Sequence, residues 1–172
     1  IEGKAAVNRR DKEGGTALLS AAARGHGQIA DLLLLYKADA TLELNNKRRD
    51  NAFMLAAASG HIGVVEALLK RLGQQAAANT RNSNGSTPLM AAAAAGRAEV
   101  VSALIDAGAS VNMRSNLQGD TALMRATIGR DLSIVRRLLK AKADINQRST
   151  QGYTAVCWAV FLQNADMVRL LC

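Results

Sequence analysis

Aromatic residues are scarce in this 172-residue chain, where Phe, Trp and Tyr together make up 3% of the sequence. Hydrophobic residues nevertheless reach 49%, so a packed core has to be built from Ala, Leu, Val, Ile and Met. Small apolar side chains suit helices that approach one another closely, which favours an all-α fold. A single proline and 14 glycines argue against a disordered or linker-rich chain.

Cysteine and long apolar runs are also rare. The two cysteines, Cys157 and Cys172, are too few to staple a secreted scaffold. We therefore expect reduced thiols in an intracellular protein, in the cytoplasm or the nucleus. No apolar run approaches the roughly 18 residues that a membrane span needs, and the first residues lack a signal-peptide pattern. No H-E-x-x-H, Walker loop or G-x-S-x-G occurs, so we expect no catalysis, metal or cofactor.

Acidic residues are the third shortage. The chain has 14 Asp and Glu against 22 Lys and Arg, a formal net charge of +8. Such a surface favours an acidic peptide, a phosphorylated motif, nucleic acid or an anionic membrane as partner. The alternative is that a small basic domain is merely soluble, because charge alone names no partner.

One motif recurs five times along the chain. Its anchor residues are spaced 35, 36, 34 and 33 residues apart, and they are Thr16, Asn51, Thr87, Thr121 and Thr154. A glycine follows the first three anchors by nine residues, at Gly25, Gly60 and Gly96, and an apolar block follows each glycine. A period of 33 to 36 residues indicates a repeat architecture.

Each copy predicts a pair of short helices. Thr and Asn are good N-cap residues, because the side-chain oxygen accepts a hydrogen bond from an otherwise unpaired backbone N–H. Pro88 follows such a cap, where its missing N–H costs nothing. The glycine ends the first helix in a left-handed turn, and a second helix carries the apolar block. Isolated helices shorter than about 12–15 residues are marginal in water, so neighbouring pairs must stack.

The third copy, Thr87-Pro88-Leu89-Met90-Ala91-Ala92, resembles the ankyrin signature T-P-L-H-x-A. Gly25-His26 and Gly60-His61 resemble the Gly-His turn of that family, and Ala109-Ser110-Val111-Asn112 resembles its closing motif. The resemblance implies an all-α ankyrin-repeat solenoid of stacked helix-turn-helix units with hairpin-like loops, about five repeats long. It also implies a monomeric, non-enzymatic protein that binds another protein.

The predicted organisation is a single domain over residues 1–172. Residues 1–8 are the tail of a preceding repeat, and the repeats are 9–43, 44–79, 80–112, 113–146 and 147–172, the last incomplete. The second repeat is irregular, with Arg49 in place of the loop glycine and an insertion of about three residues within 71–78. Arg130 and Gln163 replace the turn glycine, so the turn at Arg130 is expected to be reshaped. We expect the chain to be a piece of a longer array, or to have lost flanking segments.

In the ankyrin family the partner usually lies in a concave groove, between the loop tips and the exposed side of each first helix. Arg10, Arg81, Arg114 and Arg148 hold one position of four repeats, and we call these four the arginine ladder. The second loop carries Lys47, Arg48 and Arg49 instead. Guanidinium groups suit bidentate pairing with carboxylate or phosphate. The alternative is a solvated charged edge.

Bulky residues gather in the last two repeats. Tyr153, Trp158, Phe161 and Leu162 lie on the fifth loop and first helix, with Ile128 and Arg125 one repeat earlier. Trp, Tyr and Arg are the types most enriched at binding hot spots. The alternative is that these rings pack against a sixth repeat or a missing end of the chain.

Three kinds of residue invite a chemical interpretation. Cys157 fills the slot of Leu19 and Met54, so a packed core thiol is expected rather than a nucleophile. His26 and His61 are expected to make turn-stabilising hydrogen bonds rather than bind metal. Asn112 and Asn146 resemble sites of asparaginyl hydroxylation in ankyrin proteins, but an Asn that braces the loop between repeats explains them better.

The leading hypothesis is a protein-interaction scaffold that binds an acidic or phosphorylated segment along the arginine ladder, with an aromatic anchor near the fifth repeat. A second hypothesis is a regulatory or targeting domain of a larger enzyme or channel. Direct binding of nucleic acid or anionic lipid is the third. It depends on charge alone, because few aromatics are interleaved with the cations.

Overall fold

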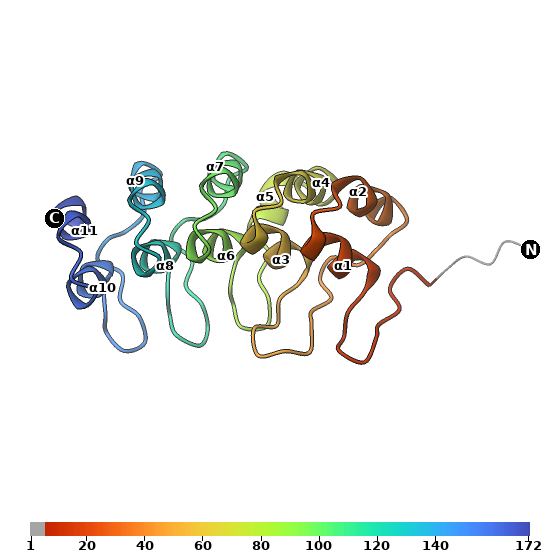
Figure 1. Cartoon of the computed structure of the whole chain (residues 1–172), viewed down its shortest axis with the longest axis horizontal. Coiled ribbons are helices and arrows are strands. Elements are labelled where there is room, and N and C mark those ends of the chain that lie inside the picture. Colours follow the sequence, from red (N-terminus) through yellow and green to blue (C-terminus); the bar gives the residue numbers. More distant parts are fainter. Residues whose placement is uncertain (1–5) are drawn as a thin grey trace, which may run out of the picture.

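Eleven α-helices in two rows form the part of the chain that the computed structural model describes, residues 6–172 (Figure 1). Within that range the only β-pairing is an isolated bridge between Glu43 and Asn51. The first-row helices are α1 (Ala17–Arg24), α3 (Ala52–Ser59), α6 (Pro88–Ala94), α8 (Ala122–Ile128) and α10 (Ala155–Phe161). The second-row helices are α2 (Gly27–Leu35), α4 (Ile62–Leu72), α7 (Ala98–Asp106), α9 (Leu132–Lys140) and α11 (Ala165–Leu171). The remaining helix, α5 (Gln74–Ala78), follows α4. Long loops project from the first row, and the predicted all-α repeat solenoid is confirmed.

Every first-row helix begins at its predicted cap. The Thr16, Thr87 and Thr121 hydroxyls each accept a hydrogen bond at 3.2 Å from the backbone N–H three residues later. Asn51 accepts from two backbone N–H groups, each at 3.1 Å. Pro88 is the first residue of α6. Local hydrogen bonding therefore fixes where each helix starts.

Equivalent positions of successive repeats stack into one continuous core. The apolar block of the second row is buried at Val64, Val100, Ile134 and Met167, all 0–1% exposed. In the first row a small residue fills the matching slot of every repeat: Ala21, Ala56, Ala92, Ala126 and Ala159, each 0–3% exposed. Because alanine adds so little bulk, the helices can approach closely enough to exclude water. The core of Ala, Leu, Val, Ile and Met that the composition predicts is present.

The insertion in the second repeat becomes an additional helical segment. Helix α4 runs for 11 residues, and α5 (Gln74–Ala78) follows after Gly73, whose φ is +86°. Ala77 and Ala78 are buried at 2% and 1% exposure. The extra residues thus lengthen the second row and leave the register of the core unchanged.

The turns without glycine keep the glycine conformation. Arg130 has φ +60° and Gln163 has φ +53°, close to the +69° of Gly96. The expectation of a reshaped turn at Arg130 is wrong, because stacking of the helices on both sides holds the connection in the left-handed region. An L-residue there is strained.

Gln163→Gly is expected to stabilise the fold by about 0.5–1 kcal/mol, because glycine adopts positive φ without steric cost. Arg130→Gly should gain less, since the Arg130 Nη2 donates to the Leu162 carbonyl at 3.0 Å and that bond would be lost. Urea denaturation followed by circular dichroism measures both variants. A lower midpoint for Gln163→Gly would contradict the assignment of strain.

The expectation that residues 1–8 end a preceding repeat falls partly on residues 1–5, which lie outside the described residues. Asn8 accepts from the Asp39 backbone N–H at 2.8 Å. Asn79 and Asn112 make the same bond to the next repeat, to Ser110 and Asp144 at 2.7 and 2.8 Å. Asparagine at the closing position therefore braces one repeat against the following one, as expected for Asn112.

Candidate functional site

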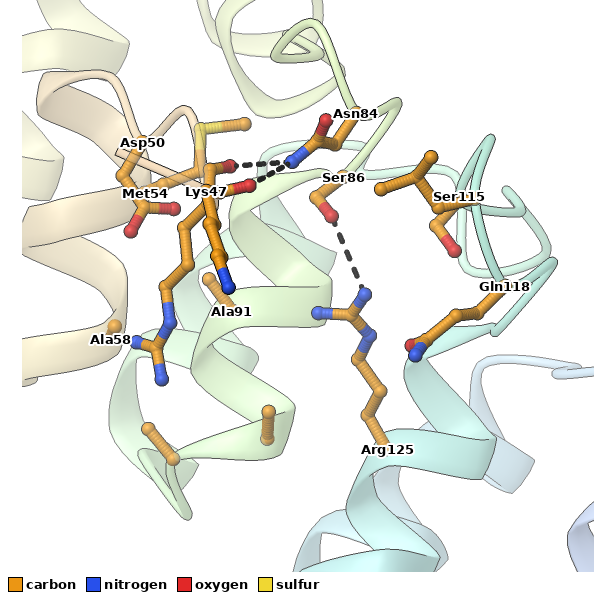
Figure 2. Close-up of a pocket in the computed structure, with 14 residues that line it drawn as sticks. Lys47, Asp50, Met54, Ala58, Asn84, Ser86, Ala91, Ser115, Gln118 and Arg125 are labelled. Carbon is orange, nitrogen blue, oxygen red and sulfur yellow. Dashed lines mark hydrogen bonds between the residues drawn. The ribbon is translucent and has the colours of Figure 1, made fainter. Parts of the chain in front are cut away.

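A cavity of about 550 Å³ opens between the loop tips and the first-row helices α3, α6 and α8. We call it the inner groove. Its floor is formed by small residues, among them Ala58, Ala91, Ala94 and Ala95. Its walls carry polar and charged side chains: Lys47, Arg48, Asp50, Asn84, Ser86, Ser115, Gln118 and Arg125 (Figure 2). The alanine floor leaves room above it for another chain.

Arg125 is the cation that reaches into the inner groove from helix α8 (Figure 2). Its Nη2 donates to the Ser86 hydroxyl at 3.4 Å. Its Nε is buried with no acceptor among the described residues, and no carboxylate in residues 6–172 pairs with it. Burial lowers the pKa of Arg125, and the nearby Asp120 and Asp50 only partly oppose that shift. The guanidinium is therefore desolvated and incompletely paired.

Two carboxyl groups lie near this cation without contacting it. Burial raises the pKa of Asp50, against the opposing charges of Arg48 and Arg125. Burial likewise raises the pKa of Asp120, against Arg125. Of the ionisable residues that line the inner groove, Lys47, Arg48 and Arg125 are cations and Asp50 is the single acid. The groove therefore carries net positive charge.

Asp120→Asn is expected to raise the thermal midpoint at pH 7. Asp120 is 7% exposed, and its raised pKa means that the folded state disfavours the ionised form. Its penalty is absent below the unfolded-state pKa of about 4 and grows as the pH rises through the raised folded-state value. The gain over wild type should therefore vanish near pH 3. A gain of equal size at both pH values would show that ionisation is not the cause.

The arginine ladder braces the loops. Arg10, Arg114 and Arg148 each donate to the carbonyl of the glycine in their own loop, Gly14, Gly119 and Gly152, at 3.3, 3.3 and 3.4 Å. These exposed side chains form no ion pair within the described residues. Their role toward a partner stays a prediction.

Ladder residues also join one loop to the next. Arg81 donates from Nη2 to the Arg114 carbonyl at 3.0 Å and to the Asn116 amide oxygen at 2.7 Å. Arg10 donates to the Asn45 amide oxygen at 3.2 Å. Each of these two guanidinium groups therefore contributes to the spacing between successive loops.

The three cations of the second loop are used differently. Lys47 and Arg48 line the inner groove, and their backbone carbonyls accept from the Asn84 amide at 2.8 and 3.0 Å (Figure 2). Arg49 pairs with Glu43, the residue that interrupts the ladder, with Nε 3.1 Å from Oε2. The charge of Arg49 is thus compensated internally, whereas the exposed Lys47 and Arg48 side chains form no ion pair within residues 6–172.

The structure brings three predicted aromatic residues together, and we call them the aromatic cluster. The ring centroids of Tyr153 and Trp158 lie 5.5 Å apart, and those of Trp158 and Phe161 lie 6.1 Å apart in an edge-to-face arrangement. Phe161 is 77% exposed and Ile128, one repeat earlier, is 40% exposed. Leu162 is half-buried. A set of exposed apolar rings marks a candidate contact surface.

Cys157 corrects one sequence prediction. It is exposed, whereas the equivalent Leu19 and Met54 are buried at 3% and 1% exposure. Those slots are covered by the next first-row helix, and α10 is the last such helix described. A hydrogen bond from the Thr154 hydroxyl to the thiol sulfur, at 3.3 Å, lowers the pKa of Cys157.

The histidine prediction holds for His61, whose ring Nε2 lies 3.2 Å from the Ala23 carbonyl of the preceding repeat. Within residues 6–172 no three His, Cys, Asp or Glu side chains are grouped to hold a metal ion. The described helices are all too short or too polar to cross a membrane. The hydroxylation of Asn112 and Asn146 stays an untested alternative.

Several groove residues were not predicted from the sequence. Asp50, Asn84, Ser86 and Gln118 line the cavity. Asp50 and Ser86 each lie one residue before a helix cap, and Asn84 and Gln118 each lie three residues before one. The available signal was the Asn84-Gly85 turn, which places a loop tip at this point. The repeat alignment also contained a signal, because the positions one and three residues before the caps recur in neighbouring repeats and meet in one groove.

Comparison with protein families accounts for the whole chain. The family described as "Ankyrin repeats (3 copies)" matches residues 1–76, 29–115, 70–149 and 113–172. These overlapping matches extend from the first residue to the last. No curated protein matches the chain at a significant level.

Proposed function

Because this chain belongs to the ankyrin-repeat family, we propose that it is a scaffold that binds an acidic segment of another protein in the inner groove. Ankyrin repeats are in general protein–protein interaction modules. The single observation that supports the acidic partner is the set of cations on the groove walls, Lys47, Arg48 and Arg125, above a floor of alanines. Charge complementarity of this kind steers association and selects partners.

The shape of the groove also supports a polypeptide ligand. The groove measures about 550 Å³ and runs across three consecutive first-row helices, α3, α6 and α8, so an extended segment could lie along it. Its floor of Ala91, Ala94 and Ala95 is made of small side chains and the exposed Leu117 adds apolar surface, so the polar wall residues supply the charge selectivity. The arginine ladder extends the positive surface along the loops in both directions from the groove.

Selection from a displayed random-peptide library tests this function. Peptides retained by the wild-type protein are expected to be enriched in Asp and Glu. The enrichment should fall on Lys47→Ser/Arg48→Ser, which leaves Arg125 in the groove, and persist unchanged on Arg136→Ser/Lys140→Ser. That control removes the same charge from exposed positions of the second-row helix α9.

Retained peptides without acidic enrichment, or equal retention by both double variants, would contradict the proposal. Single-stranded DNA or RNA oligonucleotides form a separate arm of the experiment. If an oligonucleotide bound wild type more tightly than the selected peptides and lost that affinity in Lys47→Ser/Arg48→Ser, the groove would be a nucleic-acid site. The proposed function would then be wrong.

A further inference from the structure

Arg125 and Trp158 occupy the same position in consecutive repeats. Each lies four residues after its helix cap, Thr121 or Thr154. The earlier repeats carry Ser20, Leu55 and Ala91 in that slot. Only repeats four and five therefore place a guanidinium and an indole side by side along the exposed surface of the first row.

Both side chains contain a buried donor without an acceptor. The Arg125 Nε and the Trp158 Nε1 are each enclosed, and no hydrogen-bond acceptor is within reach among residues 6–172. Buried polar groups in folded proteins are nearly always paired, so an unpaired one calls for an explanation. Two such groups at one repeat position distinguish this surface from the rest of the stack.

The Arg125 guanidinium is partly desolvated and weakly hydrogen-bonded, which favours the binding of an anion. Its burial has already removed much of the water that an incoming carboxylate would have to displace, and its one hydrogen bond, to Ser86, is long at 3.4 Å. A carboxylate that met the Nη groups would form charge-assisted, bidentate hydrogen bonds. Asp50 and Asp120 lie near enough to interact electrostatically with the Arg125 guanidinium, but neither forms an ion pair with it. An external carboxylate would supply the ion pair that the Nη groups lack.

Trp158 presents a different chemistry one repeat along. It packs between Tyr153 and Phe161, and the 77% exposure of Phe161 leaves an uncovered apolar surface beside it. Packed neighbouring helices lie about 8–10 Å apart. The helices that carry Arg125 and Trp158, α8 and α10, therefore have axes about that distance apart.

We propose, on the basis of the proposed function, that Arg125 and the aromatic cluster together recognise a two-residue motif in the partner. The motif is a Glu or Asp carboxylate on Arg125 and an apolar side chain on Trp158 and Phe161. In a polyproline-II segment, residues three apart point the same way and lie about 9 Å apart. This distance matches the spacing of neighbouring helices, so we assign the partner an extended segment with the motif residues three positions apart.

The probe is a fluorescein-labelled, proline-rich peptide with Glu and Leu three positions apart, made in both orders. Matched peptides replace Glu with Gln, or separate Glu and Leu by five positions. Fluorescence anisotropy at fixed ionic strength gives the affinity for wild type, Arg125→Gln, Arg125→Lys and the charge control Arg136→Gln. Thermal melts of the four proteins establish that each is folded.

Wild type and Arg136→Gln are expected to bind one order of the Glu–Leu peptide at least tenfold more tightly than its Gln counterpart or its five-position counterpart. Arg125→Gln should bind the Glu and Gln peptides equally. Arg125→Lys should keep a reduced preference, because lysine retains the charge but loses the bidentate geometry. Should Arg125→Gln fail to fold, the side-chain NMR signal of the wild-type Arg125 Nε–H must shift with the Glu peptide and not with the Gln peptide.

An unchanged Glu preference in Arg125→Gln would overturn the inference. If that preference were instead lost in Lys47→Ser/Arg48→Ser, the proposed function would stand without the role of Arg125. If wild type showed no preference for any acidic peptide, both would fail. Tighter binding of a phosphoserine peptide than of the Glu peptide would overturn the assignment to a carboxylate.

Discussion

Leu104→Ala is expected to lower the free energy of unfolding by about 2–5 kcal/mol, the usual cost of removing a buried leucine. Leu104 is 0% exposed on helix α7, in the middle of the stack. The cavity would lie between repeats, where each helix pair depends on its neighbours for burial. Urea denaturation followed by circular dichroism gives the loss directly.

The chain provides its own control, since Leu33 occupies the equivalent slot of helix α2 and is only half-buried. Leu33→Ala removes the same atoms and should cost clearly less, because part of that side chain already contacts solvent. Equal losses for the two variants would show that burial between repeats does not govern stability.

Trp158→Ala is expected to weaken binding of a library-selected acidic peptide by about 2 kcal/mol or more, the range of interface hot spots. The indole is the centre of the aromatic cluster, with Tyr153 and Phe161 on its two sides. Isothermal titration calorimetry measures the affinity, and a thermal melt reports stability in parallel. Phe161→Ala should have a smaller effect on affinity, because Phe161 contacts Trp158 from one side only.

The two measurements separate the alternatives for the cluster. Lost affinity with an unchanged melting temperature would support a contact surface. A lower melting temperature with unchanged affinity would contradict it and assign the rings to packing at this end of the stack.

Local chemistry explains why the framework could be predicted from the sequence. A Thr or Asn cap and an apolar block after a turn act within a few residues, so Thr87 or Val100 reveals its role in the sequence alone. The exposure of Cys157 could not be predicted this way, because it depends on whether a further helix covers that position. Its exposure follows from the position of α10 in the stack.

The candidate site was only partly predictable for a related reason. Lys47 and Arg48 were predicted as cations of the loop that interrupts the ladder, and Arg125 as a neighbour of Ile128. All three line one groove. The same reasoning treated Arg49 and the arginine ladder as equivalent cations. Their internal partners, such as Glu43 for Arg49 and Gly119 for Arg114, depend on loop conformations that sequence spacing does not specify.

Amide chemical-shift mapping with a selected acidic peptide tests most directly whether the inner groove is the binding surface. The largest shifts are predicted at Arg48, Ser86, Gln118 and Arg125, with helices α2, α7 and α9 of the second row unaffected. Shifts confined to the second row, or spread evenly over both rows, would contradict binding in the inner groove.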